Sequence, residues 1–180
     1  MEIIKTHIEG LLIIKPRVFK DDRGYFFESF RSDLFSQLGL EQTFVQDNES
    51  MSQKGVLRGL HFQNPPFVQG KLVRVVKGLV LDVAVDIRRN SETFGQHMKI
   101  ELSEDNKTML WIPEGFAHGF LTLRDKTIFQ YKCTNYYNKE TEGSILWNDP
   151  ALSIDWGISS PIVSSKDMNA PLFSDLNSNF

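Results

Sequence analysis

Three side chains in strand-like stretches are of the types needed to form and protonate an enolate: His61, Lys71 and Tyr131. Imidazole titrates near neutral pH and can act as a general base, and a phenol can act as an acid when a charged partner tunes it. An ammonium group can stabilise a negatively charged enolate oxygen. The sequence therefore offers a candidate base, acid and electrostatic stabiliser for proton transfer.

Each of these side chains also has a purely structural interpretation. His61 could be a core histidine with one satisfied hydrogen bond, and Tyr131 a core tyrosine whose hydroxyl is bonded within the fold. Lys71 is the stronger functional candidate, because it shares a strand face with Val73 and Val75. Lysine is almost never fully buried unless it is paired.

The segment around His61 raises a question of geometry. Strict strand alternation puts Arg58 and His61 on opposite faces. Gly59 lies between them, and a bulge at this glycine would bring both side chains to one side of the sheet.

The other histidines give a weaker signal. His7 and His97 lie near the ends of elements beside charged residues, and we expect both at the surface. The segment Pro113-Glu114-Gly115-Phe116-Ala117-His118 resembles the second half of the metal motif of cupins. The first half, a His-x-His pair followed by a glutamate, is missing, since Phe62 and Gln63 follow His61. Because a stable site needs three or four ligands, we expect a cupin-like barrel that does not rely on a metal.

The elements that must position these residues are short strands separated by turns. Residues 81–88 alternate between aliphatic and polar side chains, which predicts a half-buried antiparallel strand. One helix is predicted from Ser32, as its cap, through Leu34, Phe35 and Leu38, with Gly39 ending it. Further strands are predicted at 71–77, 99–102, 109–112, 120–123 and 127–134. Many strands and almost no helix indicate an all-β sandwich or barrel that can hold a small ligand in its mouth.

The composition limits the class of protein. The chain has 180 residues, 41% hydrophobic and 24% charged, which is typical of a folded domain, and we expect residues 1–180 to form one domain. A net charge of −3 argues against general nucleic-acid binding. The single cysteine, Cys133, excludes an internal disulfide, and we interpret it as a small core residue. No signal-peptide or membrane-spanning pattern is present, so we expect a cytoplasmic protein.

Over nearly its full length the chain resembles the dTDP-4-dehydrorhamnose 3,5-epimerase family. The matching motifs occur in one order along the chain: Asp22-Arg23-Gly24 with Phe27-Glu28, Gln46-Asp47-Asn48, Leu57-Arg58-Gly59-Leu60-His61-Phe62-Gln63, Lys71-Leu72-Val73, residues 112–120, Tyr131-Lys132-Cys133-Thr134 and Ser165-Lys166-Asp167. Any one motif is weak evidence, but the ordered set is specific.

The resemblance implies an all-β, cupin-like jelly-roll with a few short helices, a homodimer, and no metal or organic cofactor. It implies that His61 is the base, that Asp167 orients it, that Lys71 faces a C4 carbonyl and that Tyr131 is the acid on the opposite face. It further implies a group of sugar and nucleotide contacts: Arg23, Glu28, Gln46, Asp47, Asn48, Arg58, His118, Tyr137, Glu142 and Lys166.

The expected substrate is a dTDP-4-keto-6-deoxyhexose, whose C3 and C5 hydrogens are both acidified by the C4 ketone. Relatives that invert C3 alone or C5 alone use the same base and acid, so a mono-epimerase on a related sugar remains an alternative. Two further alternatives are a cupin-like barrel that only binds a sugar nucleotide and a metal-dependent cupin enzyme.

Overall fold

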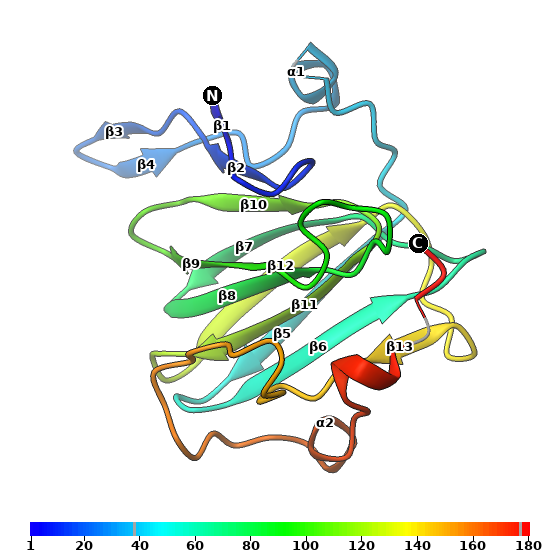
Figure 1. Cartoon of the computed structure of the whole chain (residues 1–180). Coiled ribbons are helices and arrows are strands. Elements are labelled where there is room, and N and C mark those ends of the chain that lie inside the picture. Colours follow the sequence, from blue (N-terminus) through cyan, green and yellow to red (C-terminus); the bar gives the residue numbers. More distant parts are fainter. Residues whose placement is uncertain (38, 177) are drawn as a thin grey trace.

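A computed structural model of the chain describes residues 1–37, 39–176 and 178–180 (Figure 1). Two antiparallel sheets face each other in a jelly-roll sandwich, which confirms the all-β prediction. The first sheet has six strands, in the order β1 (Glu2–Lys5), β2 (Leu12–Lys15), β10 (Met109–Ile112), β7 (Lys71–Lys77), β12 (Thr127–Cys133) and β5 (Gln46–Ser52). The second has five, in the order β13 (Glu142–Ser144), β6 (Leu57–Gln63), β11 (Phe116–Thr122), β8 (Leu79–Asp86) and β9 (His97–Ser103).

The apolar core lies between the two sheets. Val73 and Val75 of β7 pack with Phe129 of β12 and with Phe116 and Phe120 of β11. This arrangement follows from the period of two, which sends alternate side chains of each strand inward. The same inward face carries Lys71 and Tyr131, as the sequence predicted.

The prediction that 81–88 forms a half-buried strand is wrong about where the strand ends and about its burial. β8 is antiparallel to both neighbours, but it ends at Asp86, and its polar face is buried as completely as its aliphatic face. Asp82 and Asp86 are 0% exposed. The aliphatic face is covered by the C-terminal region, whose Leu152 and Trp156 pack against this sheet, so the polar face lies on the inner side.

The outer face of the six-stranded sheet is covered by the segment that contains helix α1 (Ser32–Gln37). Phe35 packs there with Leu72 and Trp111. The helix is where the sequence predicted it, although Ser32 is its first residue rather than the residue before it. Leu38, predicted to be part of its apolar face, lies outside the described residues.

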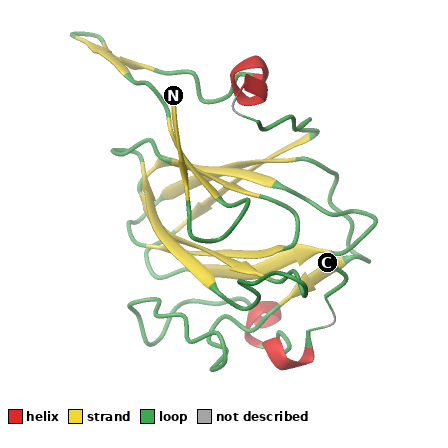
Figure 2. Cartoon of the chain, turned by 45° about the horizontal axis from the view of Figure 1, so that its top comes forward, coloured by secondary structure: helices red, strands yellow, loops and turns green. Residues whose placement is uncertain are grey.

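A hairpin of β3 (Phe19–Asp21) and β4 (Gly24–Phe26) projects from the body of the molecule (Figures 1 and 2). It pairs with neither large sheet. Phe19, Tyr25 and Phe26 are 49%, 56% and 67% exposed, which is unusual for such large apolar side chains.

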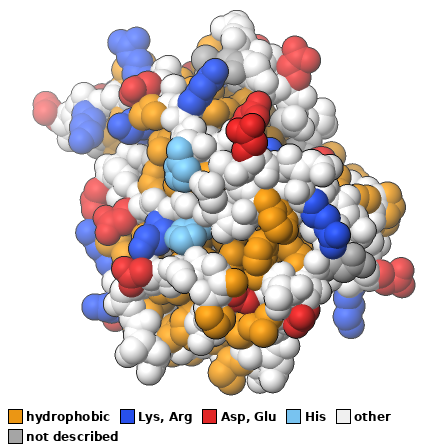
Figure 3. Space-filling view, viewed as in Figure 1, with side chains coloured by type: hydrophobic (Ala, Val, Ile, Leu, Met, Phe, Trp, Pro, Cys, Tyr) orange, Lys and Arg blue, Asp and Glu red, His pale blue; other side chains and the backbone are white. Residues whose placement is uncertain are grey.

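The remaining short elements are in the C-terminal region: helix α2 (Ser165–Met168) and a 3-10 turn (Phe173–Asp175). Charged side chains of both signs are scattered over the face shown in Figure 3, with hydrophobic side chains reaching the surface in its lower half. Among the described residues, no helix is long and apolar enough to cross a membrane.

Candidate active site

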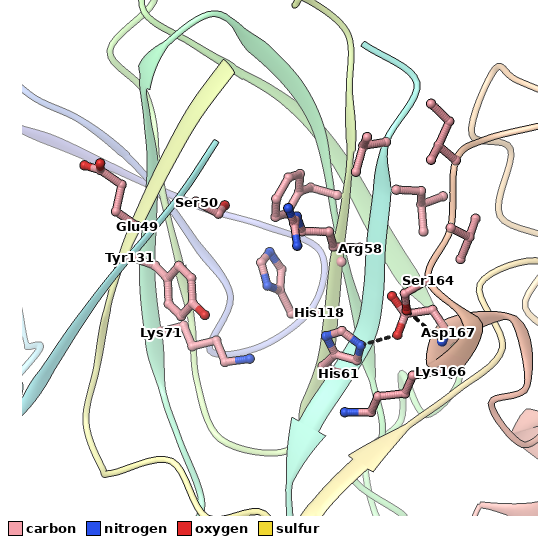
Figure 4. A pocket seen from close by; sticks show the side chains of 16 residues that line it. Glu49, Ser50, Arg58, His61, Lys71, His118, Tyr131, Ser164, Lys166 and Asp167 are labelled. Atoms are coloured by element: carbon pink, nitrogen blue, oxygen red, sulfur yellow. Dashed lines mark hydrogen bonds and ion pairs between the residues drawn. The ribbon is translucent and has the colours of Figure 1, made fainter. Parts of the chain in front are cut away.

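A cavity of about 450 Å³ opens between the two sheets, and side chains from both sheets and from α2 line it (Figure 4). It brings together seven of the residues predicted from the sequence. These are Arg58, His61, Lys71, His118, Tyr131, Lys166 and Asp167.

His61 and Asp167 form a hydrogen-bonded pair across 106 residues of chain. Nε2 of His61 lies 2.6 Å from Oδ1 of Asp167. A carboxylate only accepts hydrogen bonds, so the neutral imidazole carries its proton on Nε2, and Nδ1 is left free to accept another. The pair therefore has the orientation that a general base requires.

A bulge at Gly59 explains why Arg58 and His61 share the cavity. His61 pairs with His118 and Arg58 pairs with Phe120, so two residues of β6 lie opposite the single residue Gly119. Gly59 has a φ of +122°, and a Cβ there would lie 2.5 Å from the Cα of Gly119. The bulge that the sequence suggested is present, and only glycine fits at its centre.

Asp167 is held in place by the short helix α2. The Ser164 side chain caps this helix by accepting a hydrogen bond from the Asp167 N–H, and the Gly59 N–H donates to Oδ2 of Asp167 at 3.3 Å. Burial raises the pKa of the Asp167 carboxyl. The hydrogen bond and charge of His61, with the hydrogen bonds to Gly59 and Ser164, outweigh burial, so the pKa is lowered overall. The Asp167 carboxylate is therefore ionised at neutral pH.

Lys71 begins β7 and lies on the inner face beside Cys133, its partner in the strand register. Burial lowers the pKa of the Lys71 ammonium, and the nearby Cys133, Asp82 and Glu142 oppose this shift. Lys71 is half-buried at the cavity wall, where an ammonium group interacts with a negative charge beside it more strongly than it would in open water.

Tyr131 lies across the cavity from His61, with Lys71 below and between them (Figure 4). Burial raises the pKa of the Tyr131 phenol, as does nearby Cys133, while Asn48 and Arg58 act in the opposite direction. The phenol is therefore protonated at neutral pH, as an acid must be before it reacts.

A second carboxylate–histidine pair was not found from the sequence. Nε2 of His118 lies 3.0 Å and 2.9 Å from the two carboxylate oxygens of the buried Asp82. The signal was present, since Asp82 lies between Leu81 and Val83 in an apolar strand. The alternating pattern led us to place its face toward solvent, and so its role was missed.

A charged cluster lies beside the cavity. Lys166 Nζ is 2.6 Å from Oε2 of Glu142, and the Tyr137 hydroxyl donates to the same oxygen at 3.1 Å. Burial raises the pKa of the Glu142 carboxyl, but the hydrogen bond and charge of Lys166, helped by Tyr137, lower it overall. On the other side, Arg58 Nε donates to the Ser52 hydroxyl at 3.1 Å, which leaves the rest of its guanidinium for a ligand.

Three predicted contacts, Gln46, Asp47 and Asn48, are on β5 and are not among the residues that line the cavity. Gln46 and Asn48 are hydrogen-bonded to each other at 3.1 Å. Asp47 points to the opposite side of the strand, where it pairs with Lys132 at 2.9 Å.

The structure leaves two predicted contacts outside the cavity altogether. Arg23, at the tip of the projecting hairpin, has a side chain that is 91% exposed and pairs with Asp21. Glu28 pairs with Arg31 at 3.3 Å.

The donor set of the cavity is suited to proton transfer rather than to holding a metal. Among the described residues, no group of three or more His, Cys, Asp and Glu side chains is arranged to hold a metal ion. His61 and His118 are each committed to a carboxylate of their own. Together the cavity offers a candidate base and a candidate acid on opposite sides, with the Lys71 amine between them.

Comparison with known proteins decides the family. A family model described as dTDP-4-dehydrorhamnose 3,5-epimerase matches residues 5–175. The chain belongs to the dTDP-4-dehydrorhamnose 3,5-epimerase family. It is 58% identical over 174 residues to the enzyme of that name from Salmonella typhimurium, covering 96% of this chain and 95% of the relative.

Solved structures of the epimerase family share the fold as well as the sequence. A dTDP-6-deoxy-D-glucose-3,5-epimerase from Legionella pneumophila, in complex with dTDP-4-keto-L-rhamnose, superposes with a TM-score of 0.94 at 50% identity, covering 98% of this chain and 94% of that one. A 3'-monoepimerase from Streptomyces bikiniensis, in complex with dTDP-quinovose, gives a TM-score of 0.88 at 34% identity, covering 94% and 86%.

Proposed function

We propose that this chain converts dTDP-4-dehydro-6-deoxy-D-glucose into dTDP-4-dehydro-L-rhamnose by inverting C3 and C5 of the sugar. The observation that carries the proposal is one cavity with the His61–Asp167 pair on one side, Tyr131 on the other and Lys71 between them. Membership of the family supports the same reaction.

The reaction begins with removal of a proton next to the C4 ketone. Nδ1 of His61 takes the proton from C3 or C5, and the electron pair left behind moves into an enolate whose charge collects on the C4 oxygen. Asp167 stabilises the imidazolium that forms without taking the proton itself. Lys71 stabilises the C4 oxygen, and a preorganised donor of this kind contributes about 3–4 kcal/mol.

Inversion is completed when a proton returns to the same carbon from the opposite face. In this proposal Tyr131 supplies the returning proton, which its position across the cavity from His61 supports. Its phenol O–H bond breaks as the new C–H bond forms and the C4 carbonyl is restored. Net inversion thus needs two groups of different type, one on each side of the ring.

The nucleotide end of the substrate requires positive charge and an aromatic surface. Arg58 and Lys166 at the cavity supply cations for the diphosphate. The Arg58 guanidinium can bind phosphate in a two-point fashion, and the Lys166 ammonium acts as a single charge. Tyr137 is 54% exposed beside this cluster and offers a ring for the thymine to stack on.

The same proposal includes a homodimer. Arg23 and Glu28 lie outside their own cavity, and the hairpin that carries Arg23 exposes three aromatic side chains. A second copy would give these aromatic side chains a surface to pack on, and would bring Arg23 and Glu28 within reach of that copy's substrate. We also place the enzyme in the cytoplasm, where its thiol Cys133 stays reduced.

Proton NMR of dTDP-4-dehydro-6-deoxyglucose incubated with the enzyme in D2O tests this function. We expect deuterium at both C3 and C5, together with the L-lyxo product. Deuterium at one carbon only would establish a mono-epimerase instead, and the absence of any exchange would overturn the proposed substrate.

A further inference from the structure

Two histidines from neighbouring strands face the cavity side by side. His61 of β6 and His118 of β11 are directly opposite each other in the strand register, and both line the cavity (Figure 4). Side chains that are opposite each other on one face of an antiparallel pair have Cβ atoms about 4.5–5.5 Å apart. A group bound next to the proposed base is therefore also within reach of His118.

The orientation of the His118 ring is fixed by Asp82. Nε2 of His118 lies 3.0 Å and 2.9 Å from the two oxygens of this carboxylate. A carboxylate only accepts hydrogen bonds, so the neutral imidazole carries its proton on Nε2. The ring also stacks on Phe129, with 6.1 Å between the ring centroids and 23° between the planes. Nδ1 is thereby left as an acceptor with a fixed direction.

Nδ1 of His118 is open to the cavity. In the described part of the chain it has no hydrogen-bond partner, since both bonds of this ring use Nε2. The buried side-chain atoms without a partner in that part of the chain are the hydroxyl oxygens of Ser50 and Thr122, and Nδ1 is not one of them. An unpaired nitrogen that is not sealed inside the protein, on a residue that lines the cavity, faces whatever the cavity binds.

The carboxylate of Asp82 has a single hydrogen-bonding partner. It is 0% exposed, and within the described residues both of its oxygens accept from His118 alone. A buried carboxylate destabilises a fold unless it is paired. Asp86, equally buried on the same strand, is different, because it accepts from Arg88 and Ser91 and so holds a loop. The carboxylate of Asp82 therefore serves the imidazole of His118 rather than the packing of the strands.

We propose that Asp82 is a positioning residue, which holds His118 so that its Nδ1 accepts a hydrogen bond from the hydroxyl group on C3 of the sugar. This hydroxyl is the donor carried by a reacting carbon, because C5 carries a methyl group and the ring oxygen, neither of which donates. With its hydroxyl bound to His118, C3 presents its hydrogen to His61 on the next strand. This role rests on the proposed function, and it goes beyond the general sugar or nucleotide contact that the sequence suggested for His118.

Heteronuclear NMR of the histidine rings in the protein without substrate tests the tautomer. The chain has four histidines, so comparison with His118→Gln assigns the His118 signals. Near neutral pH the wild type should carry the His118 proton on Nε2. Asp82→Asn has nearly the same shape, but its amide NH2 can donate to Nε2 and should move the proton to Nδ1. A wild-type proton on Nδ1, protons on both nitrogens, or the same tautomer in both proteins would overturn the proposal.

Deuterium exchange during turnover tests the link to C3. Asp82→Asn should slow exchange at C3 by about five- to tenfold more than at C5, the loss expected for one hydrogen bond. The charge of Asp82 also acts on Lys71, where it opposes the lowering of the pKa by burial. A change at Lys71 would slow both carbons alike, since both enolates place their charge on the C4 oxygen. An equal loss at C3 and C5 would therefore contradict the role proposed for Asp82.

Asp86→Asn is the matched control. It makes the same chemical change in an equally buried carboxylate of the same strand, outside the cavity lining. It should lower the stability of the protein and leave the His118 tautomer and the ratio of C3 to C5 exchange as in wild type. A shift of either in this control would overturn a role specific to Asp82. Absence of exchange in the wild type would instead refute the proposed function itself, and the tautomer measurement separates the two failures.

Discussion

At the scale of single residues, the site depends on the direction in which each proton donor and acceptor points. His61 is directed by Asp167 through Nε2, and Tyr131 lies on the far side of the same cavity. These two placements are the basis for proposing His61 as the base and Tyr131 as the acid.

Removing the proposed base should block proton removal at both C3 and C5. We expect His61→Ala to reduce deuterium exchange at C3 and at C5 by at least ~10²-fold, since general bases contribute about that much or more. NMR in D2O measures both carbons in one sample. Substantial exchange in this variant would show that another group removes the proton.

Removing the acid should separate exchange from inversion. Tyr131→Phe keeps the ring and deletes only the hydroxyl, so proton removal by His61 should be spared more than net inversion. The ratio of deuterium incorporated to inverted product, measured in the same NMR experiment, should therefore rise. Equal loss of both quantities would argue against the acid role.

The depressed pKa of Asp167 predicts how stability depends on pH. A carboxyl whose pKa is lower in the folded protein than in the unfolded chain stabilises the fold fully at pH values above its pKa in the unfolded chain. This stabilisation is lost as the pH falls through the pKa in the folded protein. The gap in unfolding free energy between wild type and Asp167→Asn should therefore shrink as the pH falls below about 4. Urea unfolding at several pH values measures this gap, and a constant gap would show that the carboxylate charge is not what stabilises the pair.

At the scale of elements, the site is built by a defect in a strand. The bulge in β6 puts Arg58 and His61 on one side, and the close contact of Gly59 with Gly119 sets how near β6 and β11 approach. A longer side chain at either position would force the strands apart.

Gly59→Ala should therefore destabilise the fold by about 2–4 kcal/mol, through backbone strain together with overpacking against β11. Gly157→Ala is the matched control, because Gly157 also has a positive φ, of +70°, but nothing lies within 4 Å of its added Cβ. Chemical denaturation should show a clearly smaller loss for the control. Similar losses would mean that φ alone, and not the contact with Gly119, requires the glycine.

Sequence periodicity predicted the strands that form β7 to β12, because a period of two is a local property of the chain. It placed Lys71–Lys77 and Met109–Ile112 and put Lys71 and Tyr131 on the inner face. It failed for the polar face of β8 because burial of that face depends on a C-terminal region folded over the other side. His97 was predicted at the surface and is half-buried for a similar reason, since its environment comes from distant residues.

The same limit applies to the site. The motifs around His61 and Asp167 named the residues, but the 2.6 Å contact between them joins segments 106 residues apart. The buried Asp82 had a local signal in its apolar strand, but its pairing with His118 joins segments 36 residues apart, which periodicity does not show. The assignment of residues 1–180 to one domain remains a prediction.

At the scale of the whole molecule, the projecting hairpin is the feature that a single copy does not explain. Its exposed Phe19 and Phe26 would normally be covered in a stable protein. Light scattering should therefore give twice the mass of one chain.

A variant with Phe19→Ser and Phe26→Ser should shift the monomer–dimer equilibrium toward the monomer. It should also reduce turnover, because the same hairpin carries Arg23. Leu172→Ser, which changes a 40% exposed apolar residue in the C-terminal region, serves as the control. A dimer of unchanged stability in the hairpin variant would show that the copies meet elsewhere.

The position of Asp167 also has a consequence for the order in which the protein matures on the ribosome. The last strand of the two sheets, β13, ends at Ser144, whereas Asp167 is synthesised more than twenty residues later. A nascent chain therefore holds all the strands of the sandwich before His61 has its partner. If Asp167 orients the base as proposed, catalytic competence is added by one of the last segments to be translated, so a prematurely terminated chain would keep the strands of both sheets and lack the chemistry.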